Sequence, residues 1–175
     1  MQRWRVPLGF ACAALFLFFA RPSSWSLAIG AAVAVPGLLL RAWASGHLRK
    51  NETLATSGPY AYTRNPLYLG SFLIGLGFTI AAGQVLLVVI FLVMILGIYL
   101  PVMRVESATL AELFGKKYVR YAKEVPLLFP RLSAYRKQSG TKFDRNLYRR
   151  YREYRAAIGM AITWALLVLK AIYFK

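Results

Sequence analysis

Four long stretches of this chain contain no charged side chain, and this feature constrains the fold more than any other. They comprise 15 residues between Arg5 and Arg21, 19 between Arg21 and Arg41, 39 between Arg64 and Arg104, and 14 between Arg155 and Lys170. A helix that crosses a bilayer needs roughly 20 apolar residues. The pattern therefore predicts an integral membrane protein.

The longest block is too long for one helix and predicts two, with a turn near Ala82-Gly83-Gln84. The expected fold is all-α and polytopic, a single domain over residues 1–175. About five membrane spans are expected, at residues 6–22, 25–43, 67–82, 85–103 and 156–174. A cleaved signal peptide is the rival interpretation of the first block, because Arg3 and Arg5 precede a short apolar run.

The basic residues are distributed unevenly along the chain, whose net charge is +17. If the N-terminus is cytoplasmic, every Lys and Arg except Arg21, Lys170 and Lys175 falls on the cytoplasmic side, as do all six acidic residues. The positive-inside rule favours this orientation. It accounts for the charge better than a nucleic-acid partner does, so we expect membrane lipids as partners and no nucleic acid. The expected cytosolic segments are residues 44–66 and 104–155.

The first cytosolic segment, residues 44–66, is rich in turn-forming residues. Ser57-Gly58-Pro59 predicts a turn. Pro66 favours the first turn of the third span, with Thr63 or Asn65 as the residue that caps it. The amide groups at that helix start suit an anionic group of a ligand.

The second cytosolic segment is expected to begin with a helix over residues 104–123 that continues the fourth span. One stripe of its surface is apolar and aromatic, and Val125-Pro126 ends it. The sequence from Leu127 to Pro130 then suggests a return to the membrane surface. Residues 142–155, rich in Tyr and Arg, favour an interfacial amphipathic helix.

Residues able to do chemistry are few. His47 is the only histidine and Cys12 the only cysteine, so we expect no metal site and no reactive role for Cys12. A polar and aromatic cluster remains at the expected membrane surface: Tyr60, Tyr62, Arg64, Asn65, Tyr68, Arg104 and Glu106. A carboxylate so close to the bilayer needs a cation. Glu106 therefore either pairs with Arg104 or binds a charged ligand.

Two blocks of sequence resemble the isoprenylcysteine carboxyl methyltransferase family, to which phospholipid N-methyltransferases are related. The first reads Leu54-(x)3-Gly58-Pro59-Tyr60-(x)3-Arg64-Asn65-Pro66-(x)-Tyr68-(x)-Gly70. The second reads Glu106-(x)3-Leu110-(x)3-Phe114-Gly115-(x)2-Tyr118-(x)2-Tyr121-(x)3-Val125-Pro126-(x)3-Pro130. Together they cover about residues 52–131, in the same order as in the family.

The resemblance implies a membrane methyltransferase that uses S-adenosylmethionine bound on the cytosolic side, with a lipophilic acceptor that enters from the bilayer. The acceptor group is a carboxylate, an amine or a thiol. Asn65 and Glu52 stand where the eukaryotic carboxyl methyltransferases have histidine, and Val102 where they have arginine, which argues against assuming a prenylcysteine acceptor. The cofactor contacts carried over are Glu52, Thr53, Leu54, Ala55, Tyr60, Asn65, Pro66, Leu67, Tyr68 and Glu106.

The chemistry of the cofactor agrees with these residues. Arg64 and the helix amides after it suit the carboxylate of the cofactor, and Glu106 suits a cationic or hydroxyl group. Methyl transfer needs alignment and exclusion of water more than an acid–base pair. Arg104 and Glu106 are the candidate catalytic residues. Two alternatives stay open: a reductase similar to the membrane sterol reductases, and a non-enzymatic scaffold or lipid-binding protein.

Overall fold

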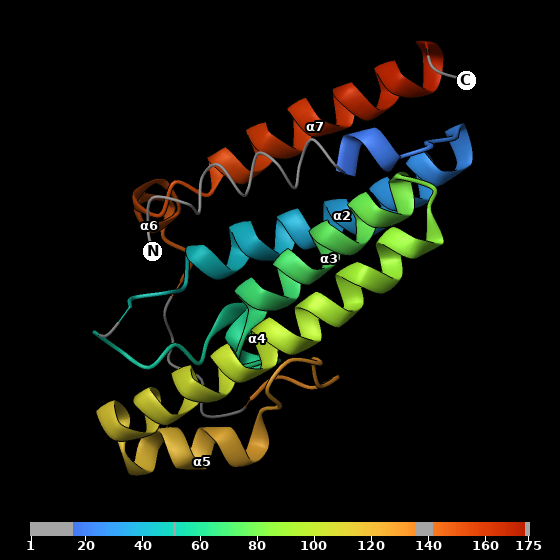
Figure 1. The fold of residues 1–175 in the computed structure, drawn as a ribbon. Helices are drawn as coiled ribbons and strands as arrows, with labels where there is room; N and C mark the ends of the chain where they lie inside the picture. The colour runs from blue at the N-terminus through green and yellow to red at the C-terminus, as the bar shows by residue number, and fades with distance from the viewer. Residues whose placement is uncertain (1–15, 51, 136–141, 174–175) are drawn as a thin grey trace, which may run out of the picture.

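The computed structural model describes residues 16–50, 52–135 and 142–173, and this part of the chain is helical without strands. Long helices run side by side as a bundle, and the shorter elements gather at one end of it (Figure 1). The elements are α2 (Ser24–Ser45), the 3-10 helix η2 (Gly58–Ala61), α3 (Pro66–Ala81), α4 (Val85–Phe114), α5 (Lys116–Glu124), α6 (Arg145–Arg150) and α7 (Tyr154–Tyr173).

Three of the described helices, α2, α4 and α7, are long and apolar enough to cross a membrane. They correspond to the predicted second, fourth and fifth spans. The predicted third span is α3, which has only 16 residues and is about 24 Å long at 1.5 Å per residue. The predicted first span, residues 6–22, lies mostly outside the described residues, of which Phe16 to Phe19 are helical.

Helices α2 and α3 pack at glycines that face one another. A Cβ added to Gly30 would lie 2.4 Å from the carbonyl oxygen of Gly77, and one added to Gly37 would lie 2.7 Å from that of Gly70. Each helix thus presents two glycines seven residues apart, which brings both pairs to the same face. Small residues let the backbones of membrane helices approach closely, so the short helix α3 is held against α2.

The turn between α3 and α4 lies where the sequence predicts it. Gly83 has a φ of 67°, which glycine adopts without the steric cost that other residues meet. Two hydrogen bonds attach this turn to the start of α2. The Arg21 amide donates to the Ala82 carbonyl at 2.7 Å, and the Ser26 hydroxyl donates to the Ala81 carbonyl at 3.0 Å.

The predicted single helix over residues 104–123 is wrong at one position. Helix α4 continues the membrane span without interruption to Phe114 and ends at Gly115, whose φ is 54°. Only glycine adopts this backbone conformation readily. Helix α5 then folds back beside the end of α4 (Figure 1). The break turns Tyr118 and Tyr121 inward, where both are buried.

One end of the bundle carries most of the charged residues, and we call it the basic end. It contains residues 46–65, 115–135 and 142–153 of the described chain. The amide of Asp144 donates to the Gly46 carbonyl at 2.9 Å, which ties the last of these segments to the first. The predicted interfacial helix at residues 142–155 is instead the short helix α6, a turn, and the start of α7.

Candidate functional site

Two segments that are distant in sequence join at the basic end through their backbones. The amide of Arg64 donates to the Pro126 carbonyl at 3.0 Å. The amides of Arg131 and Tyr135 donate to the carbonyls of Tyr62 and Ala61 at 3.0 and 2.9 Å. These hydrogen bonds satisfy backbone groups of both segments. They hold the segment after α5 alongside the segment before α3.

Side chains from the two segments strengthen this junction. The Tyr121 hydroxyl donates to the Tyr60 carbonyl at 2.6 Å, and the Thr63 hydroxyl donates to the Leu128 carbonyl at 2.9 Å. Asn65 precedes α3 as predicted, but no side-chain hydrogen bond caps the helix. Its amide nitrogen donates to the Leu127 carbonyl at 2.9 Å instead. The side chain predicted to cap α3 therefore holds the two segments together.

A cavity of about 810 Å³ lies beside this junction and is bounded by the end of α4 and by α5. Its volume is in the range of small-molecule sites. The cavity brings together residues from both blocks of the sequence motif, including Tyr60 and Glu106. Nine of the predicted site residues line it: Thr53, Leu54, Ala55, Tyr60, Arg64, Asn65, Leu67, Tyr68 and Glu106.

Three predicted site residues do not line the cavity. Glu52 is exposed and Pro66 is buried at the start of α3. Arg104 is exposed on α4, and neither ion pair within the described residues joins it to Glu106. Of the two alternatives left open for Glu106, the structure therefore does not support the pair with Arg104, and a catalytic role for Arg104 stays a prediction. His47 lies outside the lining as well, and its ring bonds to the Trp43 carbonyl oxygen.

Much of the cavity wall was not among the site residues predicted from the sequence. Some of these residues precede the first block, and others lie on α4 around the start of the second block. Four more are positions that the second block names but that were given no role in the site. The aromatic stripe of the second segment was a usable signal, since Leu110, Phe114, Tyr118 and Tyr121 belong to it. The additional lining residues are Leu48, Arg49, Lys50, Pro101, Val102, Val105, Ser107, Thr109, Leu110, Phe114, Tyr118 and Tyr121.

Arg64 contributes a guanidinium to the cavity wall. Its Nη1 donates to the Tyr118 hydroxyl at 3.2 Å. Its Nε is buried away from the cavity and has no hydrogen-bond partner among the described residues. The residue that the sequence predicted to bind a carboxylate therefore lines the cavity, oriented by Tyr118 of α5.

Glu106 supplies a negative charge to the same cavity. It extends from α4, and Tyr68 of α3 lines the same cavity. Two carboxylate oxygens accept about four hydrogen bonds, so Glu106 can accept several from a ligand. The cavity thus offers a cationic donor at Arg64 and an anionic acceptor at Glu106, an arrangement that suits a zwitterionic ligand.

Two buried tyrosines form the inner wall of the cavity as neutral phenols. Burial raises the pKa of Tyr60 well above its usual value, and the nearby Tyr121 and Glu106 raise it further. Burial also raises the pKa of Tyr121, while the charge of Arg64 opposes the shift. Neither phenol releases its proton at neutral pH. They therefore serve as hydrogen-bonding and packing surfaces rather than as bases.

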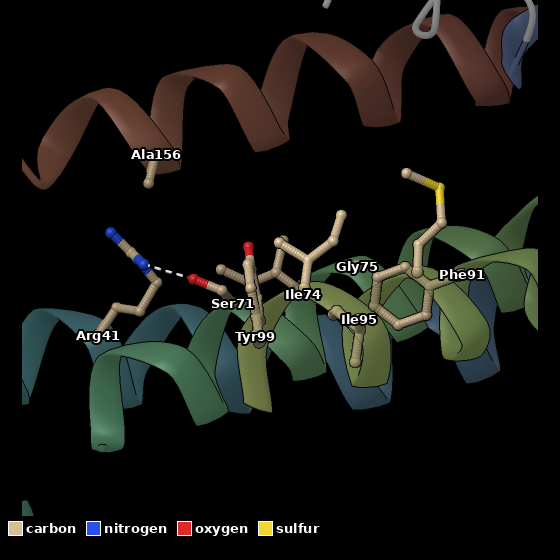
Figure 2. A pocket seen from close by; sticks show the side chains of 10 residues that line it. Arg41, Ser71, Ile74, Gly75, Phe91, Ile95, Tyr99 and Ala156 are labelled. Atoms are coloured by element: carbon tan, nitrogen blue, oxygen red, sulfur yellow. Dashed lines mark hydrogen bonds between the residues drawn. The ribbon is translucent and has the colours of Figure 1, made fainter. Parts of the chain in front are cut away.

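A second, smaller cavity lies inside the bundle, and we call it the bundle groove. It has a volume of about 470 Å³ and a mostly apolar lining that comes from α3, α4 and the start of α7 (Figure 2). Arg41 and Ser71 mark one end of the groove in Figure 2, and Phe91 marks the other. The lining residues are Arg41, Ser71, Ile74, Gly75, Phe91, Met94, Ile95, Ile98, Tyr99 and Ala156.

The charge of Arg41 at the end of the groove is neutralised. Its Nε and Nη2 donate to the two carboxylate oxygens of Glu153 at 3.0 and 2.8 Å. Its Nη1 donates to the Ser71 hydroxyl at 2.6 Å (Figure 2). Paired charge-assisted bonds of this kind are strong and directional. They attach the turn before α7 to α2, and they leave the groove without a free charge.

The two cavities approach each other at a pair of tyrosines. Tyr68 lines the larger cavity and Tyr99 lines the bundle groove. Their ring centroids are 5.3 Å apart in an edge-to-face arrangement, within the preferred range for aromatic pairs. A contact between one tyrosine of α3 and one of α4 therefore joins the wall of the larger cavity to the wall of the bundle groove.

Comparisons with known proteins relate the chain to two proteins named for metal resistance. The chain is 35% identical over 159 residues to the cobalt-zinc-cadmium resistance protein CzcN of Cupriavidus metallidurans, covering 82% of this chain and 72% of that protein. It is 30% identical over 156 residues to the nickel-cobalt-cadmium resistance protein NccN of Alcaligenes xylosoxydans xylosoxydans, covering 82% and 73%.

The name of a third relative states an enzyme activity. The chain is 33% identical over 81 residues to the protein-S-isoprenylcysteine O-methyltransferase of Schizosaccharomyces pombe, covering 46% of this chain and 34% of that protein. No solved structure matches the chain. Residues 4–117 match the phospholipid methyltransferase family. With its apolar helices and its relation to the isoprenylcysteine methyltransferases, this chain is an integral membrane protein that belongs to the phospholipid methyltransferase family.

Proposed function

We propose that this protein transfers the methyl group of S-adenosylmethionine to a lipophilic acceptor at the membrane. The observation that carries the proposal is the cavity that joins both sequence blocks, with the side chains of Arg64 and Glu106 in its wall. The family supports a membrane methyltransferase. The methyl donor, the acceptor and the residue roles below are our inference from the cavity.

The residues of the cavity fit the charges of S-adenosylmethionine. Arg64 would bind the carboxylate of the methionyl group through guanidinium N–H groups that line the cavity. Glu106 would bind the ammonium group or a ribose hydroxyl. Burying each charge against an opposite charge with hydrogen bonds avoids most of the desolvation cost.

Aromatic side chains complete the proposed donor site. Phe114, Tyr118 and Tyr121 come from the end of α4 and from α5. Aromatic faces pack against a purine ring and attract a sulfonium cation. The donor brings a methyl group that is already activated on a sulfonium sulfur. The chain then has to hold it in line with the acceptor and exclude water.

The proposed acceptor carries a hydrocarbon chain that lies in the bundle groove. Arg41 is neutralised by Glu153, so this groove favours an uncharged chain over a free anionic group. The acceptor group then reaches the donor past Tyr68 and Tyr99. An acceptor nitrogen, oxygen or sulfur forms the bond to the methyl carbon while the sulfonium sulfur takes the electrons of the broken bond. A proton released by an amine or thiol goes to Glu106 or to water.

We place the N-terminus and the basic end at the cytoplasm, because the positive-inside rule favours the basic segments there. Reporter fusions test this orientation. A cytoplasmic reporter fused after Lys50 or after Arg131 is expected to be active, and an exported reporter at the same positions is expected to be inactive. A fusion at Gly83, in the turn between α3 and α4, is the matched control and is expected to give the opposite result.

The decisive experiment is transfer of labelled methyl from S-adenosylmethionine. The purified protein in lipid is incubated with total membrane lipid and with small-molecule extracts, and products are identified by mass spectrometry. We expect label in a lipid product and saturable donor binding by calorimetry. Binding of NADPH instead would favour a reductase, and binding of neither compound would favour a non-enzymatic protein.

We further propose that this methyl transfer contributes to tolerance of divalent transition metals. The support is that two relatives are named for resistance to such metals, and the chain matches 72% and 73% of their lengths. Deletion of the gene is expected to lower growth in cobalt, zinc or cadmium, and complementation with the Glu106→Ala variant is expected to fail. Full complementation by that variant would separate resistance from methyl transfer.

A further inference from the structure

We propose that α5 and the segment after it form a membrane-binding element that docks on anionic phospholipids of the same bilayer. This docking element comprises residues 116–132. It also supplies part of the cavity wall, so docking would stabilise the closed cavity. The proposed partner is a lipid surface and not the methyl acceptor. The expected effect of docking on donor binding rests on the proposed function.

The first observation is the charge on α5. Four cationic residues of this nine-residue helix are exposed: Lys116, Lys117, Arg120 and Lys123. Neither ion pair of the described residues includes any of them. The opposite face of the helix is buried through Tyr118 and Tyr121. A helix with a buried aromatic face and an unpaired cationic face suits an anionic lipid surface.

The second observation is a pair of exposed apolar side chains directly after α5. Phe129 is 74% exposed, and Leu132 is fully exposed. Arg131 lies between them, and its guanidinium is hydrogen-bonded to the Glu124 carbonyl and the Ser133 hydroxyl. Leaving Phe and Leu side chains in water is unfavourable. The lipid interface would remove that cost.

The third observation places these side chains at the level of the bilayer surface. Arg131 donates to the carbonyl of Tyr62, and the Leu128 carbonyl accepts from Thr63. Both partners lie within four residues of Pro66, where α3 begins. Because α5 folds back along α4 (Figure 1), the chain returns toward the membrane-spanning part of the bundle. The exposed apolar pair is therefore close to the start of α3, where we expect the hydrocarbon region to begin.

The same element is part of the cavity. Tyr118 and Tyr121 line it, and Tyr121 holds the Tyr60 carbonyl. Anything that binds the docking element in this position also stabilises the cavity wall. By linkage, docking and donor binding would each strengthen the other by the same factor.

The test of docking uses fluorescence from a single labelled cysteine in the full chain. Leu132→Cys is made in a Cys12→Ala background, labelled with an environment-sensitive dye and reconstituted in nanodiscs. Leu113→Cys is the matched control, because Leu113 is also an exposed leucine but lies near the tip of α4. We expect lipids with a spin-labelled acyl chain to quench the dye at residue 132 and not at residue 113. Equal quenching at the two positions would overturn the proposal.

The test of the anionic partner compares phosphatidylcholine discs with discs that also contain phosphatidylglycerol. We expect quenching at residue 132 to increase with phosphatidylglycerol, and the increase to vanish when all four α5 cations are changed to Gln. Donor affinity of the unaltered protein is expected to rise about fivefold in the anionic discs. A quenching response that ignores lipid charge would refute the anionic partner. Absence of donor binding in every disc would count against the proposed function but leave the docking result standing.

Discussion

The interface of α2 with α3 and the junction at the basic end each hold two segments of the chain together, but through different contacts. The interface joins two regular helices at pairs of glycines, and its contacts repeat every seven residues. The junction joins two irregular segments through hydrogen bonds that do not repeat, such as Arg64 to Pro126 and Tyr121 to Tyr60. In the bilayer, close packing replaces the hydrophobic force between helices. At the surface, hydrogen bonds can hold irregular segments together, because water forms hydrogen bonds with the backbone groups that have no protein partner.

The difference teaches where sequence changes will be tolerated. The glycine interface has no room, so any added side chain moves a backbone. The junction has a cavity beside it, so loss of one bond changes ligand binding before it changes the fold. The largest expected effects therefore fall in the bundle and the more selective ones at the basic end.

Filling the glycine interface is expected to have the largest effect. Gly77→Leu would place a side chain against the Gly30 carbonyl oxygen, which lies 2.5 Å from an ideal Cβ. We expect a loss of about 3 kcal/mol or more in stability, measured as thermal unfolding in detergent and as the yield of monodisperse protein. Gly97→Leu is the control, because a Cβ at Gly97 meets nothing within 4 Å. Equal losses in both variants would contradict the role of close packing.

Breaking the Arg41–Glu153 ion pair is expected to have the next largest effect. Glu153→Gln leaves the Arg41 guanidinium with a weaker partner in a site where the side chains are 23% and 11% exposed. We expect a loss of about 2–3 kcal/mol, less than for a fully buried pair because water reaches this one. Measured stability should recover in the Arg41→Leu/Glu153→Leu double variant. No recovery would mean that Arg41 acts mainly through Ser71.

Removing the cavity carboxylate is expected to change ligand affinity and leave the bundle intact. Glu106→Ala should weaken binding of S-adenosylmethionine by about 1–3 kcal/mol, the scale of a lost charge-assisted hydrogen bond. Calorimetry of the variant in detergent measures this directly. The thermal midpoint should stay close to that of the unaltered protein. Unchanged affinity would refute the assignment of Glu106 to the donor site.

The smallest effect is expected for Cys12→Ala. Cys12 lies outside the described residues, and a lone thiol in an apolar stretch usually acts as a small apolar residue. We expect methyl transfer and thermal stability of the variant to match those of the unaltered protein. A large loss of activity would mean that the thiol takes part in the reaction.

Much of the bundle was predictable because its signals are local. The turn at Gly83 and the spans that became α2, α4 and α7 follow from the length of the apolar blocks and the position of their charges. The prediction of one helix over residues 104–123 is wrong at Gly115. The apolar periodicity continues through that residue, but its backbone has a positive φ and leaves the helical conformation. The packing of α2 on α3 was not predicted, since a glycine pattern has meaning only once two helices are adjacent.

The sequence was sufficient to predict which residues form the candidate site, but not how their side chains are arranged. Sequence analysis placed Tyr60, Arg64 and Glu106 in one site, and all three line one cavity. Asn65, one of the two predicted caps, does stand at the N-cap of α3, but its side chain donates to Leu127 and does not bond to the helix. Of the two alternatives for Glu106, the ion pair with Arg104 is not among the ion pairs of the described residues. Both outcomes concern the direction of a side chain, which depends on neighbours far away in sequence.

The sequence alone determined that this chain enters a membrane, roughly where its long apolar helices lie, and which family it resembles, because hydrophobic length and motif spacing are properties of neighbouring residues. Tertiary structure decided which side chains meet. The Arg41–Glu153 pair spans 112 residues of sequence and the Tyr121–Tyr60 bond spans 61. Contacts at such separations depend on how every intervening helix packs and turns, and no local pattern contains that information.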